Sequence, residues 1–207
     1  MRYNDFREAL KIFTVFSVDD IRRIDNRFNV RRLVEWQDKG YIKKIIRGHY
    51  IFANLELNEN VLFEIANRIY SPSYISFEMA LSFHHMIPES VYGLTSATSR
   101  KTKVFKTKIG DFIYRTIQPR LLFGYKLIDY IGRRLKVAEP EKALLDYFYL
   151  NTSIKSEDDF AEMRIDRDQY LTYVDESRLL AYINEFRQKR LSKRVKSFME
   201  YMKNVKY

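Results

Sequence analysis

A change of hydrophobic period at Gly40 limits what the first fifty residues can fold into. Apolar side chains before this glycine recur at helical spacing, and three helices are predicted there, at residues 2–11, 17–24 and 27–39. Ser17 suits the N-cap of the second helix, and Gly40 suits the position after the third. Two short strands with a glycine between them are predicted next, at residues 41–47 and 50–52. This order predicts a winged helix-turn-helix over residues 1–55.

The third predicted helix, residues 27–39, has an apolar side and a cationic side. With Trp36 beside them, four residues at i, i+3, i+4 and i+7 are expected to face the core: Val30, Leu33, Val34 and Gln37. The exposed start of such a helix enters the major groove, where arginine bonds guanine and asparagine bonds adenine. Candidates for base contact are Arg27, Asn29, Arg31 and Arg32, and candidates for phosphate contact, on or beside the hairpin, are Lys43, Lys44, Arg47 and His49. The alternative is a helix with a solvated cationic face.

The rest of the chain predicts a larger mixed α+β domain over residues 59–207, with helices at its C-terminal end. The polar segment 54–60 is interpreted as the linker. Further helices are predicted at residues 59–70, 76–85, 141–150, 156–165, 175–187 and 189–205. Residues 91–137 are rich in β-branched and aromatic side chains and predict several strands. The fold class is therefore α+β.

The positive charge lies in three blocks. The net charge is +10, and there are 12 Lys or Arg against 7 Asp or Glu in residues 1–55, 11 against 2 in 100–136, and 8 against 1 in 187–206. Lysine and arginine that neutralise phosphates release condensed counterions, so this distribution favours a polyanionic partner. The second block predicts a secondary basic surface made of Arg100, Lys101, Lys103, Lys106 and Lys108. Lysines on the solvated face of a sheet are the alternative.

The last block has three possible roles. It could be an arm along the DNA backbone, a helix on a membrane surface, or a solvated helix. Its apolar residues recur at i, i+4, i+7 and i+11, which favours one face packed on the body of the protein: Leu191, Val195, Phe198 and Met202.

Several other classes of protein are not expected. The chain has no cysteine, no secretory leader and no run of about 18 apolar residues, so we expect a cytoplasmic protein without a membrane partner. Adjacent His84 and His85 point about 100° apart on a helix, so no metal site is expected there. The sequence contains no glycine-rich phosphate loop and no Gly-x-Ser-x-Gly, and we expect neither a cofactor nor an enzymatic activity.

One acidic cluster allows a nuclease interpretation. Carboxylates with a lysine can hold Mg²⁺ at a phosphodiester, and the cluster comprises Glu139, Glu141, Lys142 and Asp146. Pro140 and Glu141, however, suit the first turn of a helix, and Leu144, Leu145 and Phe148 form an apolar stripe along it. The start of a packed helix is the favoured interpretation.

Three segments together resemble a known family. The first is the run from Gly40 to Tyr50, GYIKKIIRGHY. The second is YISFEMAL at residues 74–81, followed by HHMIP at 84–88, and the third is AEPEKALLD at 138–146. In this order they are similar to AbiEi-type antitoxins, the transcriptional-regulator halves of type IV toxin–antitoxin systems linked to abortive phage infection. The resemblance covers roughly residues 10–150.

The resemblance implies a repressor that binds inverted repeats in its own promoter through a winged helix. It also implies a C-terminal domain that counters a toxin of the nucleotidyltransferase type, for which direct binding of the toxin is not required. Two alternatives stay open: a winged-helix regulator whose α+β domain senses a small molecule, and a Mg²⁺-dependent nuclease targeted by the winged helix.

Overall fold

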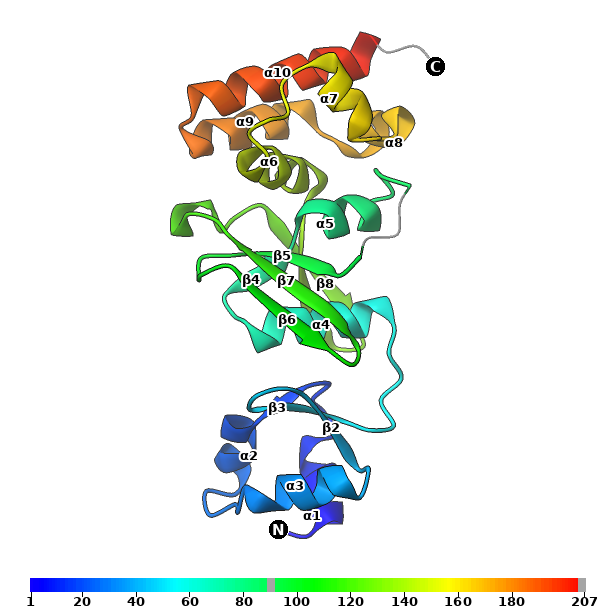
Figure 1. The fold of residues 1–207 in the computed structure, drawn as a ribbon, viewed down its shortest axis with the longest axis vertical. Helices are drawn as coiled ribbons and strands as arrows, with labels where there is room; N and C mark the ends of the chain where they lie inside the picture. The colour runs from blue at the N-terminus through cyan, green and yellow to red at the C-terminus, as the bar shows by residue number, and fades with distance from the viewer. Residues whose placement is uncertain (89–91, 205–207) are drawn as a thin grey trace.

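The chain forms three tiers along its longest axis, as Figure 1 shows. This computed structural model describes residues 1–88 and 92–204. The predicted strand region 91–137 and the predicted helix 189–205 therefore each extend by one residue outside the described part. The described chain is 47% helical and 21% strand, which confirms the α+β class. The first tier is the N-terminal module, residues 1–55, the second is a mixed sheet with two helices, and the third is a layer of helices.

The N-terminal module has three helices and a small antiparallel sheet with strand order β1-β3-β2. Its elements are α1 (Tyr3–Leu10), β1 (Phe16–Ser17), α2 (Val18–Ile24), α3 (Arg31–Asp38), β2 (Ile42–Ile46) and β3 (His49–Phe52). The predicted N-cap is confirmed, since the Ser17 hydroxyl accepts a hydrogen bond from the backbone N–H of Asp20 at 3.1 Å. Gly40 after α3 and Gly48 in the hairpin turn both have positive φ, +69° and +82°, which glycine adopts without strain.

Helix α3 starts four residues later than predicted. Residues 27–30 lie outside the helix instead. The Asp25 carboxylate accepts from the Arg27 N–H, and the Asn29 side-chain oxygen accepts from the Arg31 N–H. Local hydrogen bonds of this kind compete with helix formation and explain the later start.

The predicted core face of α3 was partly wrong. Leu33 and Trp36 are buried, but Val30 and Val34 are 41% and 58% exposed. The aromatic rings of this small core pack against Trp36 and leave no room for further side chains of α3. The buried cluster comprises Phe6, Leu10, Phe16, Ile21, Phe28, Leu33, Trp36, Ile42 and Tyr50. Gln37 is half-buried and donates to the Leu33 carbonyl at 2.8 Å.

The second tier is a six-stranded sheet of order β6-β7-β5-β4-β9-β8. Its elements are α4 (Glu59–Ile69), β4 (Ser73–Ile75), α5 (Phe77–Phe83), β5 (Leu94–Thr98), β6 (Lys103–Thr107), β7 (Gly110–Thr116), the 3₁₀ turn η1 (Pro119–Leu121), β8 (Tyr125–Tyr130) and β9 (Arg133–Ala138). The pairs β5–β7 and β4–β9 are parallel, and the other neighbours are antiparallel. Helix α4 takes the last two residues of the predicted linker, because Asn58 caps it.

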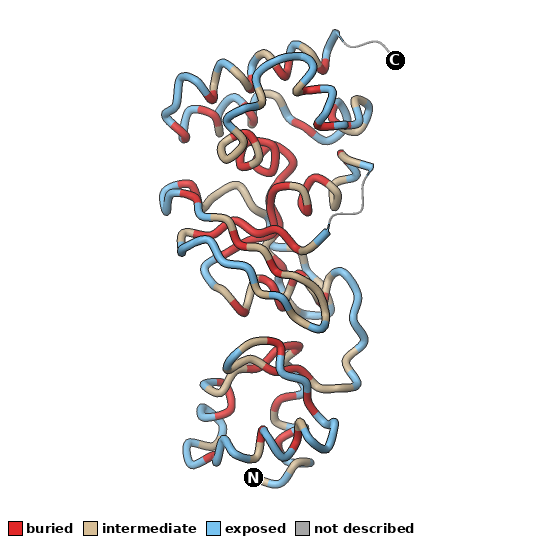
Figure 2. Tube along the Cα trace, viewed as in Figure 1, coloured by how far each residue is buried: buried red, intermediate tan, exposed pale blue. Residues whose placement is uncertain are grey.

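The third tier carries the C-terminal helices. They are α6 (Pro140–Leu150), α7 (Glu157–Glu162), α8 (Arg167–Tyr173), α9 (Glu176–Phe186) and α10 (Lys189–Asn204). Helix α6 lies between the sheet and the outer helices, and Figure 2 shows it almost entirely buried. Helix α8 was not predicted, although Asp166 caps it. The predicted apolar face of α10 is confirmed as buried.

The N-terminal module packs directly on the second tier through what we call the inter-module contact. Arg68 of α4 donates to Asp20 at 2.8 Å, and Arg133 of β9 donates to the carbonyl of Ile12 at 2.9 Å. Three apolar residues of the module, Val15, Ile45 and Ile51, join the main hydrophobic core of the second and third tiers. The contact fixes the orientation of the module, because it combines buried apolar surface with an ion pair and a directional hydrogen bond.

No helix within residues 1–88 and 92–204 has the length and the apolar character needed to cross a bilayer.

Candidate nucleic-acid interface

Lysines from two tiers meet at one hollow beside strand β2. The hollow has a volume of about 400 Å³, and its lining includes Gln37 of α3, Lys43 and Lys44 of β2, and Lys108 and Ile109 from the turn after β6. The three lysines are exposed, and none of them has an ion pair or a side-chain hydrogen bond within the described residues. The structure therefore joins part of the predicted hairpin site to part of the predicted secondary basic surface.

The remaining hairpin candidates differ from each other. Arg47 is exposed in the turn between β2 and β3, where a cation can reach a phosphate. His49 starts β3 and is half-buried, and burial lowers the pKa of its imidazole. A neutral, partly covered ring is a poor phosphate ligand at neutral pH, so the geometry does not favour the predicted role of His49.

The four predicted base-contact residues differ in exposure and in the partners of their side chains. Arg27 lies in the turn before α3 and Arg31 in its first turn, and both side chains are exposed without a described partner. Arg32 is half-buried and donates to the Met1 carbonyl at 2.6 Å, so it holds the N-terminus against α3. Asn29 is exposed, but its side-chain oxygen already accepts from the backbone N–H of Arg31. Arg27 and Arg31 are thus the two cations free to reach a ligand.

The rest of the secondary basic surface follows strand β6, which is the edge of the sheet. Lys103 and Lys106 are exposed along this strand. Arg100 and Lys101 lie beyond its other end, where the Arg100 guanidinium is 4.0 Å from the ring centroid of Tyr70 and donates to the Ser71 carbonyl. Lysine on an edge strand also discourages pairing with another sheet, so part of this charge has a structural explanation.

The acidic cluster considered for nuclease chemistry is buried in the third tier. The Lys142 ammonium pairs with Asp146 one turn along α6, and both side chains are fully buried. The other oxygen of Asp146 accepts from the Tyr74 hydroxyl at 2.7 Å and from the Ser76 hydroxyl at 2.8 Å. Three aromatic rings surround the ammonium at 5.1–5.4 Å, and burial lowers the pKa of Lys142. These groups satisfy one another inside the core, and no substrate can reach them.

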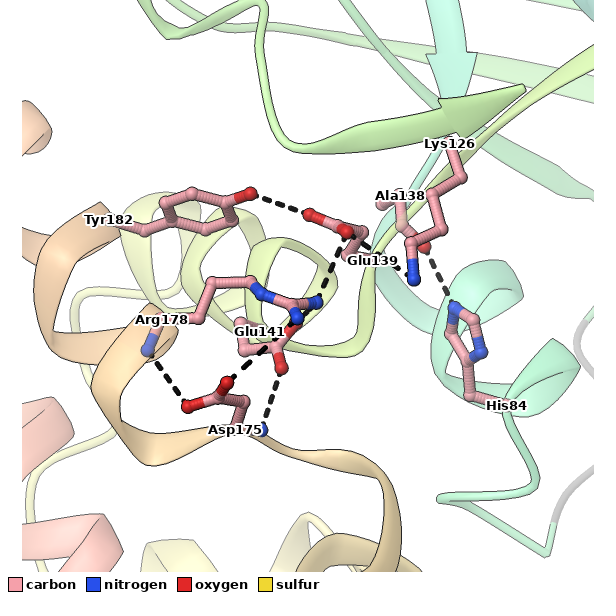
Figure 3. Close-up of polar contacts among 8 residues, drawn as sticks. All are labelled: His84, Lys126, Ala138, Glu139, Glu141, Asp175, Arg178 and Tyr182. Carbon is pink, nitrogen blue, oxygen red and sulfur yellow. Dashed lines mark hydrogen bonds and ion pairs between the residues drawn. The ribbon is translucent and has the colours of Figure 1, made fainter.

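The two glutamates of the cluster bind helix α9, as Figure 3 shows. Glu139 accepts from the Arg178 guanidinium at 3.1 Å and from the Tyr182 hydroxyl at 2.5 Å. Burial, together with this hydrogen bond, raises the pKa of Tyr182 to about 12. Glu141 accepts from the backbone N–H of Asp175 at 2.7 Å and lies 3.7 Å from Arg178. The guanidinium of Arg178 therefore lies between both carboxylates and ties α9 to the start of α6. Sequence reasoning missed Arg178 and Tyr182, because they lie about forty residues further along the chain.

Burial of Glu141 predicts a pH-dependent effect on stability. Burial raises the pKa of this carboxyl, so ionising it destabilises the folded state as pH rises above the unfolded pKa of about 4.3. In the variant Glu141→Gln the side chain cannot ionise, but it can still accept from the Asp175 N–H. The free energy of unfolding of the variant, relative to the wild type, should therefore increase as pH rises from about 4 to 7.

The measurement is urea unfolding at pH 4.5, 5.5 and 7. Glu185→Gln is the matched control, since Glu185 is exposed on the same helix as Arg178 and undergoes the same chemical change. A difference between Glu141→Gln and the wild type that stays constant over this range would contradict the expectation.

The structure offers few other sites for chemistry. Across residues 1–88 and 92–204, no group of three or more His, Asp or Glu side chains is arranged to hold a metal ion. His84 Nε2 donates to the Ala138 carbonyl, 2.8 Å away, and His85 follows the C-cap of α5 with φ +56°. Compared with known proteins, the sequence matches no protein family and no curated protein.

Proposed function

We propose that this chain is a DNA-binding transcriptional repressor whose N-terminal module is a winged helix-turn-helix. In this proposal α2 and α3 form the helix-turn-helix, and β2 and β3 form the wing. Arg27 and Arg31 face base edges at the start of α3, while Lys43, Lys44 and Arg47 contact phosphates from the wing. Its partner is the duplex DNA of its own promoter, in which it recognises inverted repeats, and the protein acts in the cytoplasm.

The observation that carries the proposal is the cationic hollow between the N-terminal module and the second tier. Lys43, Lys44 and Lys108 are exposed and free of carboxylate partners among the described residues, and they come from two parts of the chain that the inter-module contact holds together. Charges placed in this way attract a continuous polyanion that passes both tiers. The phosphate backbone of a duplex beside α3 and the wing is such a polyanion.

The exposed face of α3 supports base contact at one end of the helix. Arg31 lies in the first turn, and Glu35 and Asp38 follow on the solvent side. These carboxylates repel phosphates, so the backbone of a bound duplex is expected to approach the start of α3 and the wing. Glu35 can accept from the amino group of cytosine, whereas Arg31 can donate two hydrogen bonds to guanine.

The antitoxin part of the proposal rests on the sequence resemblance alone. We propose that the chain is the antitoxin of a type IV system and counters a nucleotidyltransferase-like toxin, without requiring a direct complex. The second and third tiers would supply this activity, and the protein itself would catalyse no reaction.

A gel-shift titration tests the repressor. The duplex upstream of the gene is compared with a scrambled duplex of equal length, and Arg31→Ala is compared with Lys43→Ala. If Arg31 bonds a base edge, Arg31→Ala should weaken binding of the upstream duplex by about 1–3 kcal/mol and reduce the preference over the scrambled one. Lys43→Ala should weaken both duplexes alike, because a phosphate contact carries no sequence information.

The control is Lys155→Ala, an exposed lysine in the loop before α7. It should leave both affinities unchanged. Equal and weak binding of the two duplexes by the wild type would remove the repressor proposal.

A further inference from the structure

A second cationic groove lies between α9 and α10, at the end of the molecule opposite the N-terminal module (Figure 1). It has a volume of about 700 Å³ and forms where Arg187, with φ +53°, turns the chain from α9 into α10. Four cations line it, Arg187, Lys189, Lys193 and Lys196, against one carboxylate, Glu200. This groove is separate from the cationic hollow beside β2.

The four cations of the groove have exposed side chains. Within residues 1–88 and 92–204, none of these side chains takes part in an ion pair or a hydrogen bond. Two basic residues of α10 outside the groove behave differently. Arg194 donates to the carbonyls of Phe148, Asn151 and Ile154, and Lys203 pairs with Glu176 at 2.7 Å.

The spacing along α10 gathers the lysines on one side of the helix. Lys189, Lys193 and Lys196 are at i, i+4 and i+7, so they follow one stripe over about 10 Å. The opposite side of α10 is buried against the third tier, through residues such as Val195 and Phe198. Three like charges on one stripe repel each other, and a polyanion in the groove would relieve that repulsion.

The lining of the groove favours phosphates of a duplex. Its uncharged polar residues, Asn184, Gln188, Ser192 and Ser197, are of the types that contact phosphate oxygens beside lysine and arginine. Among the residues that the structure describes, no aromatic side chain lines the groove, whereas single-stranded nucleic acid is bound by stacking its bases on aromatic rings. A helix that lies on a membrane needs an exposed apolar face, and the apolar face of α10 is buried.

We propose that the α9–α10 groove binds the phosphate backbone of a second DNA duplex, so that one chain joins two duplex segments. The groove contacts no base edges and binds without sequence preference. The joining of two segments rests on the proposed function of the N-terminal module, while binding at the groove does not. Because the inter-module contact fixes the module, the two surfaces stay at opposite ends of one elongated body.

The experiment uses the full chain and two duplexes. The upstream duplex is immobilised on beads, and a fluorescent duplex of unrelated sequence is added with the protein. The groove variant is Lys193→Gln/Lys196→Gln, and the control variant Lys155→Gln/Arg190→Gln has the same net charge. Arg190 is exposed on α10 but does not line the groove. Glutamine is a good helix former, so it suits positions 190, 193 and 196 of α10, whereas Lys155 lies in a loop.

The wild type and the control variant should retain the fluorescent duplex on the beads. The groove variant should retain on the order of tenfold less fluorescent duplex near 0.15 M salt. The reason is that each lost phosphate contact reduces the salt slope, the slope of the logarithm of the binding constant against the logarithm of the salt concentration, by about 0.9. Its binding to the single upstream duplex in a gel shift should equal that of the wild type. Circular dichroism checks that both variants keep their helix content.

Other results would overturn the inference or separate it from the proposed function. If the wild type binds the upstream duplex but does not retain the second one, or if the groove variant retains it fully, the groove is not a duplex site. Sedimentation with phosphatidylserine vesicles is the parallel arm, and loss of vesicle binding alone in the groove variant would assign the groove to a membrane instead. If no duplex is preferred but the groove variant loses non-specific affinity, the groove proposal stands and the repressor proposal fails.

Discussion

Replacing Asp146 with alanine should lower the free energy of unfolding by about 3–5 kcal/mol. The change leaves the fully buried Lys142 ammonium without its carboxylate and removes the acceptor for the hydroxyls of Tyr74 and Ser76. An unpaired buried charge and two unsatisfied hydroxyls all destabilise the folded state, because water no longer solvates them. Urea unfolding followed by circular dichroism measures the loss.

Two variants control this prediction. The double variant Lys142→Met/Asp146→Leu removes both charges, so it should be more stable than Asp146→Ala although the two hydroxyls still lack an acceptor. Glu176→Ala breaks the more exposed pair with Lys203 and should lose no more than about 1 kcal/mol. A loss in Asp146→Ala as small as that in Glu176→Ala would show that the buried pair contributes little.

Binding of the upstream duplex should weaken on the order of 1,000-fold between 50 and 200 mM salt. This follows if about six phosphates are neutralised, since each contributes about 0.9 to the salt slope. The hairpin and the turn after β6 supply the exposed cations for several of these contacts, among them Lys43, Lys44, Arg47 and Lys108. Fluorescence anisotropy with a short labelled duplex, titrated at five salt concentrations, gives the slope.

The variant Lys43→Gln/Lys44→Gln/Lys108→Gln then tests the cationic hollow itself. Its salt slope should be less steep by about 2.7, because three contacts are lost. The variant Lys155→Gln/Arg190→Gln should keep the slope of the wild type. A salt response that is flat in the wild type would exclude an electrostatic role for the hollow.

Local signals predicted most of the helices and strands. The Ser17 cap, the glycine after α3 and Pro140 at the start of α6 each act over a few residues, so the sequence displays them directly. Local signals do not reveal which distant residues meet. Ser76 directly precedes α5, but its hydroxyl donates to Asp146 seventy residues away and makes no capping bond to the helix.

Strand order could not be predicted for a similar reason. Ile75 of β4 lies beside Val137 of β9 in a parallel pair, and no local pattern near either residue specifies the other. The error at Val30 and Val34 has another cause. The aromatic side chains around Trp36 fill the small core of the N-terminal module, so helical spacing alone exaggerates how much of α3 is buried.

The candidate interface was predictable residue by residue but not as a surface. The charge blocks identified Lys43, Lys44 and Lys108 as cations, yet only the fold brings them to one hollow. Conversely, Arg32 and His49 matched the expected residue types, and the fold gives them other surroundings. Whether a charged side chain is free for a ligand depends on its neighbours in space.

The inter-module contact also limits how this chain can evolve or be engineered. Val15, Ile45 and Ile51 complete a core that belongs to the rest of the chain, and Asp20 binds Arg68 of the second tier. The first fifty-five residues therefore cannot be transferred to another protein as an independent unit, since the receiving protein would have to reproduce this complementary surface. Under the proposed function, new operators are reached more readily by substitution on the solvent side of α3, at positions such as Arg31 and Val34, than by recombination of whole modules.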